Sequence, residues 1–322
     1  MLIDSLGRKI DYLRVSITDR CNLNCIYCMP DKPVIPKSKN EILSFEELEK
    51  MIGILVSLGI KKIKITGGEP LVRKGVIEFI KKIYSINGLE DISLTTNGIL
   101  LKEYARDLKN AGLKRINISL DTLHNDKFIK IARGCSLSQV LAGIDEVQKL
   151  NFSPIKINTV VIKNINDDEI LDFIRLCIEN PYIVRFIEYM PTYNSLGWSN
   201  DKFVSIEEIK NICSKYWNLT PMDTISGGGP AKYFQVKGGA VGFIGPISSY
   251  FCFSCNRLRL TADGKLKLCL HSPEEVDLKT LLRNKHTDNE IKNTILSAVS
   301  LKSTGKFFNS YHNENIMCQV GG

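Results

Sequence analysis

The first two-thirds of the chain alternates regularly between two hydrophobic patterns. Short apolar runs rich in β-branched residues alternate with longer segments whose apolar residues recur every three or four positions. The short runs lie at residues 12–17, 62–66, 92–96, 115–120, 155–162 and 183–189. The longer segments lie at residues 45–58, 75–84, 102–111, 138–150 and 167–177. This alternation predicts parallel β/α units, and six units are too few for a closed eight-stranded barrel. We therefore expect an incomplete (β/α)6 barrel, with a capping box at Ser44 and Glu47.

The regular alternation of hydrophobic patterns ends at about residue 220. Residues 226–230 are a glycine-rich break, followed by strand-like pieces and one helical segment near residues 287–301. We expect residues 1–220 to form the partial barrel. Residues 221–322 should form a smaller C-terminal domain that covers the open side of the barrel.

Unusual polar residues collect where the predicted strands end. They are Cys21 and residues 67–70, 95–98, 119–121 and 188–191. Lys156 is the main exception, because it lies within the fifth predicted strand. In β/α barrels the C-terminal ends of the strands carry the chemistry, so these clusters predict one shared site.

Three cysteines follow the first predicted strand with the spacing Cys21-x3-Cys25-x2-Cys28. Three thiolates can hold three irons of a [4Fe–4S] cluster, which leaves the fourth iron open to chelate a substrate. A zinc site is the alternative, but structural zinc takes four protein ligands. No further Cys or His lies nearby, and the first histidine of the chain is His124.

A second group has the spacing Cys252-x2-Cys255-x13-Cys269. It too suggests a cluster with an open iron, although His271 could complete a zinc site. Arg257 and Arg259 lie between these cysteines and are two residues apart, so in a strand they point to the same side. They could clamp phosphates, with a solvated pair of arginines as the alternative.

The composition fits a globular cytoplasmic protein with no membrane anchor. The chain has 322 residues, and its first ten residues do not form a signal peptide. Ten cysteines in a reducing compartment suggest metal sites, while four of them stand alone as ordinary thiols: Cys135, Cys177, Cys213 and Cys318. The net charge of +8 suits a nucleic acid or a small anion. No nucleic-acid module is recognisable, which favours a small phosphorylated substrate.

The first cysteine motif, together with Gly67-Gly68-Glu69-Pro70, resembles the radical S-adenosylmethionine (radical SAM) superfamily. Nearly end to end, the chain is similar to the GTP 3′,8-cyclases of molybdenum-cofactor biosynthesis. The matching stretches are residues 13–21, 66–71, 94–98, 115–121, 185–190, 227–230, the second cysteine motif and the terminal Gly321-Gly322. The resemblance implies two [4Fe–4S] clusters and S-adenosylmethionine as cofactors. It implies GTP as substrate and (8S)-3′,8-cyclo-7,8-dihydroguanosine 5′-triphosphate as product, which a cyclic pyranopterin monophosphate synthase then uses.

The resemblance also implies roles for individual residues. Cys21, Cys25 and Cys28 match the ligands of the SAM cluster, and Cys252, Cys255 and Cys269 those of the substrate-side cluster. The positions that match contacts to SAM are Tyr27, Gly68, Ser119 and Met190. The positions that match contacts to GTP are Arg14, Lys64, Thr95, Lys156, Arg257, Leu258 and Arg259. Catalysis is expected to need the first three cysteines, both arginines of the second motif, and Gly321 and Gly322 in a tail that enters the site. Lys64 stands where arginine is common, which puts the phosphate geometry at that position in doubt.

Several alternatives stay open on the sequence. Another radical SAM enzyme with an auxiliary cluster could act on a peptide, a tetrapyrrole or RNA. An electron-transfer iron–sulfur protein with no substrate would need neither residues 67–70 nor open irons. The activity implies an external reductant, whose identity the sequence does not give. The oligomeric state is also open, with a homodimer as one option.

Overall fold

The computed structural model describes residues 1–32, 34–192, 196–223, 225, 228–272, 274–302 and 316–321. Six parallel strands follow one another in space in the order in which they occur in the sequence. They are β1 (Tyr12–Ser16), β2 (Lys62–Thr66), β3 (Asp91–Thr96), β4 (Arg115–Ser119), β5 (Ile155–Val161) and β6 (Tyr182–Glu188). All six predicted strands are therefore present, with ends that differ from the prediction by at most one residue.

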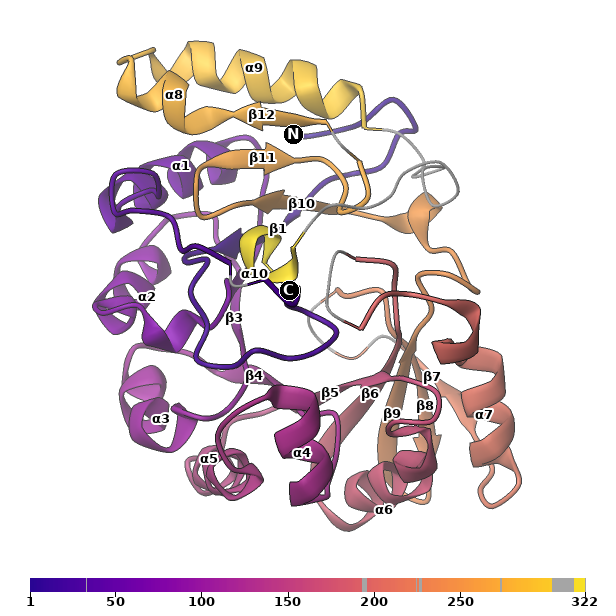
Figure 1. Ribbon diagram of the computed structural model, residues 1–322. Helices are drawn as coiled ribbons and strands as arrows, with labels where there is room; N and C mark the ends of the chain where they lie inside the picture. Colours follow the sequence, from indigo (N-terminus) through magenta and orange to yellow (C-terminus); the bar gives the residue numbers. More distant parts are fainter. Residues whose placement is uncertain are drawn as a thin grey trace.

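Helices cover the outer face of these strands and form an arc around them (Figure 1). They are α1 (Phe45–Ser57), α2 (Val76–Tyr84), α3 (Leu101–Asn110), α4 (Asn125–Ala132), α5 (Leu137–Lys149) and α6 (Ile170–Glu179). The predicted capping box is confirmed, because Ser44 Oγ accepts from the Glu47 N–H at 3.1 Å and the Glu47 carboxylate accepts from the Ser44 N–H at 2.7 Å. The incomplete (β/α)6 barrel is confirmed, whereas α4 was not predicted.

The C-terminal third of the chain extends the same sheet at both edges. At one edge β9 (Gly239–Ile244) pairs in parallel with β6 and is followed by β8 (Lys232–Val236) and β7 (Thr220–Met222). At the other edge β10 (Arg257–Leu260) pairs in parallel with β1 and is followed by β11 (Lys265–Lys267) and β12 (Glu275–Asp277). Within the described residues the sheet has twelve strands in the order β12-β11-β10-β1-β2-β3-β4-β5-β6-β9-β8-β7. The predicted domain boundary after residue 220 stays a prediction.

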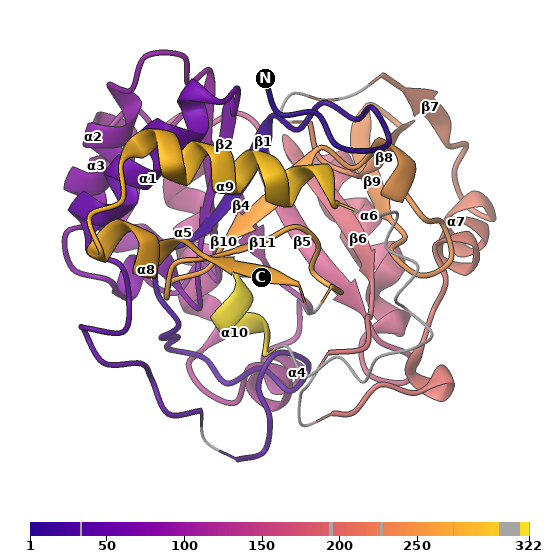
Figure 2. The same ribbon diagram turned by 90° about the horizontal axis from the view of Figure 1, so that it is seen from above.

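In the C-terminal half, the described residues form four further α-helices: α7 (Ile206–Ser214), α8 (Leu278–Arg283), α9 (Asp288–Ser300) and the short α10 (Met317–Val320). The helix predicted near residues 287–301 is α9, which begins after a capping box at Thr287 and Glu290. Seen from above, the N-terminal segment lies beside α9 (Figure 2). None of the helices in the described part of the chain has the length and apolar character needed to span a membrane.

Alternate residues of the parallel strands face opposite sides of the sheet. Leu13 and Ile63 are neighbours in register and are fully buried in the main hydrophobic core. The intervening positions Arg14 and Lys64 are also in register, and both line a cavity. The apolar side of the sheet thus packs against the helices, which leaves the polar side for a site inside the curve of the barrel.

Candidate active site

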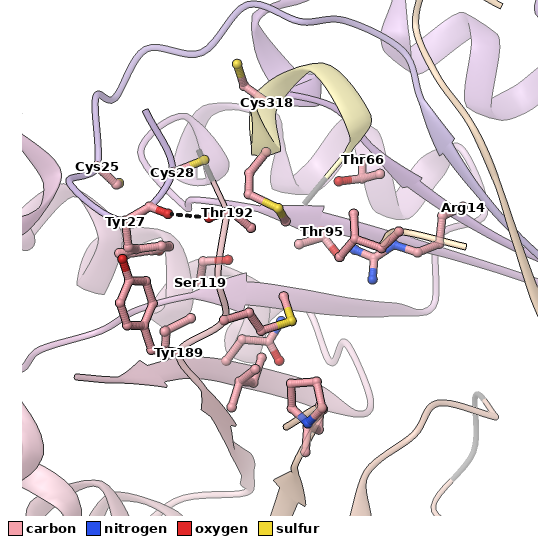
Figure 3. A pocket seen from close by; sticks show the side chains of 18 of the residues that line it. Arg14, Cys25, Tyr27, Cys28, Thr66, Thr95, Ser119, Tyr189, Thr192 and Cys318 are labelled. Atoms are coloured by element: carbon pink, nitrogen blue, oxygen red, sulfur yellow. Dashed lines mark hydrogen bonds between the residues drawn. The ribbon is translucent and has the colours of Figure 1, made fainter. Parts of the chain in front are cut away.

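A cavity of about 350 Å³ lies at the C-terminal ends of the barrel strands. Its walls include both cysteine groups and cations from β1, β2, β6 and β10. Figure 3 shows Arg14, Thr95 and Ser119 on the strands and Cys25, Tyr27 and Cys28 on the loop above them. The shared site predicted from the strand ends is therefore a single cavity in the structure.

The first cysteine triad lies on the loop between β1 and α1. The N–H groups of Cys28 and Met29 both donate to the Cys25 carbonyl at 2.9 Å, which forms a tight turn. The N–H of Ile26 donates to the Ile131 carbonyl at 2.9 Å and so ties the loop to α4. Burial raises the pKa of Cys21 to about 11. Burial also raises the pKa of Cys28, and the nearby Cys25 thiol adds to the effect.

Gly67 and Gly68 pack directly against the backbone that leads into Cys21. A Cβ at Gly67 would lie 2.6 Å from the Thr18 carbonyl oxygen, and one at Gly68 would lie 2.3 Å from that of Arg20. The Gly68 N–H donates to the Thr18 carbonyl at 2.7 Å. Side chains at either position would push the cysteine loop away, because real Cβ contacts are never this short.

Glu69 is a structural hub that the sequence reasoning did not assign as a site residue. Its side chain is 1% exposed and accepts from Leu71 N at 3.0 Å, Thr96 Oγ1 at 2.8 Å and Asn97 N at 2.7 Å. Asn97 in turn donates to Asn22 Oδ1 at 2.7 Å. Burial raises the pKa of Glu69 to about 7, and the hydrogen bonds oppose that rise. Glu69 thereby joins the glycine turn, the end of β3 and the cysteine loop.

Tyr27 is held by Asp121, which was also not assigned as a site residue. The Tyr27 hydroxyl donates to Asp121 Oδ2 at 2.7 Å, and Asp121 Oδ1 accepts from Val160 N at 2.9 Å. Burial raises the pKa of Asp121 to about 6. Ser119 and Met190 line the cavity together with Tyr27. The four positions predicted to contact SAM, with Gly68 as the fourth, therefore border one space.

The second cysteine triad lines the same cavity. The N–H of Cys255 donates to the Cys252 carbonyl at 3.1 Å, and Arg257 donates to Cys255 Sγ at 3.7 Å. Burial raises the pKa of Cys252, and the nearby Cys269 thiol adds to the effect. His271 also lines the cavity, and burial lowers its pKa to about 4.

A row of cations crosses the wall between the two cysteine groups. Arg259, Arg14 and Lys64 are in register on the adjacent parallel strands β10, β1 and β2. Burial lowers the pKa of Arg14 to about 10 and that of Lys64 well below its usual range. Arg257 and Thr95 line the cavity too, so most of the predicted GTP contacts are brought together.

Two of the predicted GTP contacts do not line this cavity. Lys156 is 3% exposed and donates to the Tyr233 hydroxyl at 3.2 Å, and neither residue lines the cavity. Leu258 is fully buried and packs in the hydrophobic core, between the two arginines of β10. Its side chain faces away from the site, so a contact to a nucleotide from this position would use the backbone.

The tail enters the site from the C-terminal end of the described residues. The short helix α10 (Met317–Val320) carries Met317 and Cys318, which both line the cavity. Arg259 donates a hydrogen bond to the Gly321 carbonyl. Gly321 has a φ of +79°, and a Cβ there would lie 2.9 Å from Thr66 Cγ2. Glycine therefore fits this position for two separate reasons, whereas Gly322 lies outside the described residues.

Two family matches cover most of the chain. Residues 15–177 match the Radical SAM superfamily, and residues 182–308 match Molybdenum Cofactor Synthesis C. The GTP 3′,8-cyclase of Alkaliphilus oremlandii is 49% identical over 99% of both chains. The GTP 3′,8-cyclase of Peptoclostridium acidaminophilum is 50% identical over 94% of this chain and 92% of its own. The chain belongs to the GTP 3′,8-cyclase family of the radical SAM superfamily.

A solved structure supports the fold of this cyclase-family chain. SuiB of Streptococcus suis bound to S-adenosylmethionine aligns with a TM-score of 0.64 over 94% of this chain and 77% of SuiB. The two sequences are only 14% identical, so this likeness concerns the fold alone.

The donor sets fit the clusters that the family uses. Each triad brings three thiols within electrostatic reach of one another, and both triads border the cavity. In the described part of the chain, no three His, Cys, Asp or Glu side chains converge closely enough to hold one metal ion. A [4Fe–4S] cluster does not require that convergence, because each thiolate binds a different iron atom.

Gly68→Ala should impair assembly of the first cluster. The added Cβ would meet the Arg20 carbonyl, so the loop that carries Cys21 would have to move. Iron content and SAM cleavage after anaerobic reconstitution measure the effect. Gly53→Ala is the control: it lies in α1 with nothing within 4 Å of the added Cβ, and it should raise stability by about 0.4–1 kcal/mol. Wild-type iron content in Gly68→Ala would contradict the prediction.

Proposed function

We propose that this chain converts GTP to (8S)-3′,8-cyclo-7,8-dihydroguanosine 5′-triphosphate in molybdenum-cofactor biosynthesis. The observation that carries the proposal is the meeting of two cysteine triads and a row of cations in one cavity. The triads fit two clusters, and the cations fit a polyphosphate. The identity of nearly half of all residues with GTP 3′,8-cyclases over the whole chain supports the same activity.

In this proposal Cys21, Cys25 and Cys28 hold one [4Fe–4S] cluster, and the second triad holds the other. When bound, the clusters and S-adenosylmethionine supply the one-electron chemistry that the protein side chains cannot supply. The residues of the chain bind and orient the reactants and exclude water from them. Tyr27, which Asp121 fixes by a hydrogen bond, forms part of the wall for S-adenosylmethionine.

The triphosphate is proposed to bind along Arg259, Arg14 and Lys64. Adjacent parallel strands lie about 4.8 Å apart, so three cations in register follow a chain of phosphates with one cation per strand. Arg257 stacks over the Phe251 ring at 4.8 Å, which fixes its guanidinium beside the second triad. Lys156 donates to the Tyr233 hydroxyl and is proposed to act on this row as a positioning residue.

The tail is proposed to place Arg259 for catalysis. The Gly321 carbonyl accepts a hydrogen bond from Arg259, which also stands in the cation row. A tail that leaves would therefore release this guanidinium from a fixed position. Gly322 is included in the proposal, although it lies outside the described residues.

A peptide, a tetrapyrrole or RNA is the alternative substrate. The buried cation row favours a compact polyphosphate over the first two, and the enclosed cavity is a poor fit for folded RNA. Our proposal also includes an external reductant, transfer of the product to a cyclic pyranopterin monophosphate synthase, and a cytoplasmic location in which the thiols stay reduced. A homodimer remains one option for the assembly.

Anaerobically reconstituted protein should contain about eight irons per chain, four for each cluster. Incubation with dithionite, S-adenosylmethionine and GTP should give the cyclised nucleotide. Cys25→Ala should abolish SAM cleavage, whereas Cys255→Ala should keep uncoupled cleavage and lose the cyclised product. Tightly bound zinc with a single cluster would contradict the proposal.

Arg259→Ala should raise the Kd for GTP roughly ten- to a hundredfold, because a charge-assisted hydrogen bond contributes about 1.5–3 kcal/mol. Deletion of residues 321–322 should instead leave both clusters and uncoupled SAM cleavage intact while nearly abolishing cyclisation. Arg175→Ala, which removes an exposed guanidinium on α6, is the control for both. If Arg259→Ala lowers the melting temperature but leaves GTP affinity unchanged, Arg259 stabilises the fold and does not bind GTP.

GTP binding should be coupled to proton uptake. Burial, then Arg185, lowers the pKa of Lys64 well below its usual range and that of Lys156 to about 7. At about pH 8 the free protein therefore holds the Lys156 amine largely neutral, and the triphosphate favours the charged forms of both lysines. GTP affinity should fall as pH rises above about 7, because the neutral Lys156 amine must first gain a proton.

Calorimetry of GTP binding in two buffers of different ionisation enthalpy measures this uptake. Lys64→Arg is the matched control, because a guanidinium keeps its charge and removes one titrating group. The number of protons taken up should be smaller in that variant. Equal binding enthalpies in both buffers would exclude the coupling.

A further inference from the structure

Two buried cations lie behind the second cysteine triad and outside the cavity. Arg8, in the N-terminal segment, is 9% exposed, and Lys302, which follows α9, is 2% exposed. Neither residue lines the cavity, so neither belongs to the cation row described above. Lysine and arginine are almost never buried this fully without a specific partner. The partners of these two residues therefore indicate what they do.

Arg8 and Lys302 each donate hydrogen bonds to the backbone at one end of the segment that carries the triad. Arg8 donates through Nη1 to the Cys252 carbonyl and through Nη2 to the Lys302 carbonyl at 3.1 Å. Its Nε donates to Asp4 Oδ2 at 2.6 Å, which fixes the orientation of the guanidinium. Lys302 Nζ donates to the Leu268 carbonyl. One cation thus binds the carbonyl of the proposed cluster ligand Cys252, and the other binds the carbonyl of the residue that precedes Cys269.

The charges of Arg8 and Lys302 also influence the pKa of the cysteine thiols of this triad. Burial raises the pKa of Cys252, while Arg8 and Lys302 act in the opposite direction. Burial lowers the pKa of Lys302, while Cys255 and Cys269 act in the opposite direction. Thiolate ligands at these positions therefore favour the charged ammonium, and the ammonium favours thiolates.

We propose that Arg8 and Lys302 form a cationic bracket, which fixes the backbone at both ends of the second triad and raises the reduction potential of the cluster bound there. Reduction adds one negative charge to a cluster, so a nearby fixed positive charge stabilises the reduced form. The bracket rests on the proposed function, because it takes Cys252, Cys255 and Cys269 as cluster ligands. It adds an electrostatic role for two residues from opposite ends of the sequence.

Lys302→Gln separates charge from hydrogen bonding. Glutamine keeps an N–H donor for the Leu268 carbonyl but carries no charge. The full-length chain with Cys21, Cys25 and Cys28 replaced by alanine should hold only the second cluster, whose midpoint potential an EPR-monitored redox titration gives. Lys302→Gln in this background should lower the potential, whereas Lys302→Arg should keep it near the parent value. Lys285→Gln, at an exposed lysine, removes the same formal charge and should leave the potential unchanged.

Arg8→Lys tests the geometric part of the bracket. Lysine keeps the charge but lacks the planar fork that reaches the carbonyls of both Cys252 and Lys302. This variant should keep a near-parent potential and release its iron to a chelator several-fold faster. If Lys302→Gln holds no cluster, recovery of the cluster in Lys302→Arg supports the bracket, and no recovery overturns it.

The outcomes distinguish the bracket from the function on which it rests. Absence of a second cluster in the parent protein would overturn the proposed function and the bracket together. A bound cluster that titrates alike in Lys302→Gln and Lys285→Gln would overturn the bracket alone. Parent-like iron release in Arg8→Lys would remove its geometric part.

Discussion

Four residues of β10 pair in parallel with four residues of β1, although the two strands are more than 240 positions apart in the chain. This pairing sets Arg259 beside Arg14, and β2 continues the row with Lys64. Because β10 follows Cys255 directly, the same pairing also brings the second cysteine triad to the mouth of the barrel. The cavity between the two triads therefore depends on the edge of a sheet rather than on the docking of a separate covering layer.

The cost of this arrangement is the burial of positive charge. Lys64, Lys156 and Arg185 are each less than 10% exposed. Lys156 donates to the neutral Tyr233 hydroxyl, and Arg185 donates to the neutral Asn117 side chain. Burying charged groups among neutral groups and other cations disfavours the folded protein. A bound polyanion offsets that penalty, so ligand binding should stabilise the folded protein. Buried groups that lower the stability of the folded protein are typical of functional sites.

Much of this architecture could be predicted because periodicity encodes it locally. The alternation of β-branched runs and amphipathic segments was sufficient for β1 to β6, and the capping box at Ser44 marked the start of α1. The pairing partners of β9 and β10 were not predictable, because short strands carry no record of which edge they join. The sequence also placed Lys156 with the nucleotide contacts, which stays a prediction, because its side chain donates to Tyr233 and does not line the cavity. The proximity of Cys318 to Cys28 depends on the return of the tail, which no local pattern encodes.

Buried carboxylates were the residues that sequence reasoning most underestimated. Glu69, Glu169 and Glu188 are each 1% exposed, and each accepts hydrogen bonds from the backbone N–H groups of other loops. Glu188, at the end of β6, accepts from Ile247 N at 2.9 Å and so ties the barrel to the segment that leads to the second triad. A carboxylate suits this task because it accepts several N–H donors at once and makes stronger bonds than a neutral acceptor.

These carboxylates explain how the parts of the site that lie on loops stay in place. The strands position the cation row, Thr95 and Ser119, whereas both cysteine triads lie outside the strands and the tail carries the short helix α10. Acidic residues hold the first triad through Glu69 and Asp121, and cations hold the second through Arg8 and Lys302. Glu69, Arg8 and Lys302 do not line the cavity, so they can fix the backbone without competing with the reactants, whereas Asp121 lines it beside Tyr27. Buried charged side chains thus hold in place the loops that carry the site.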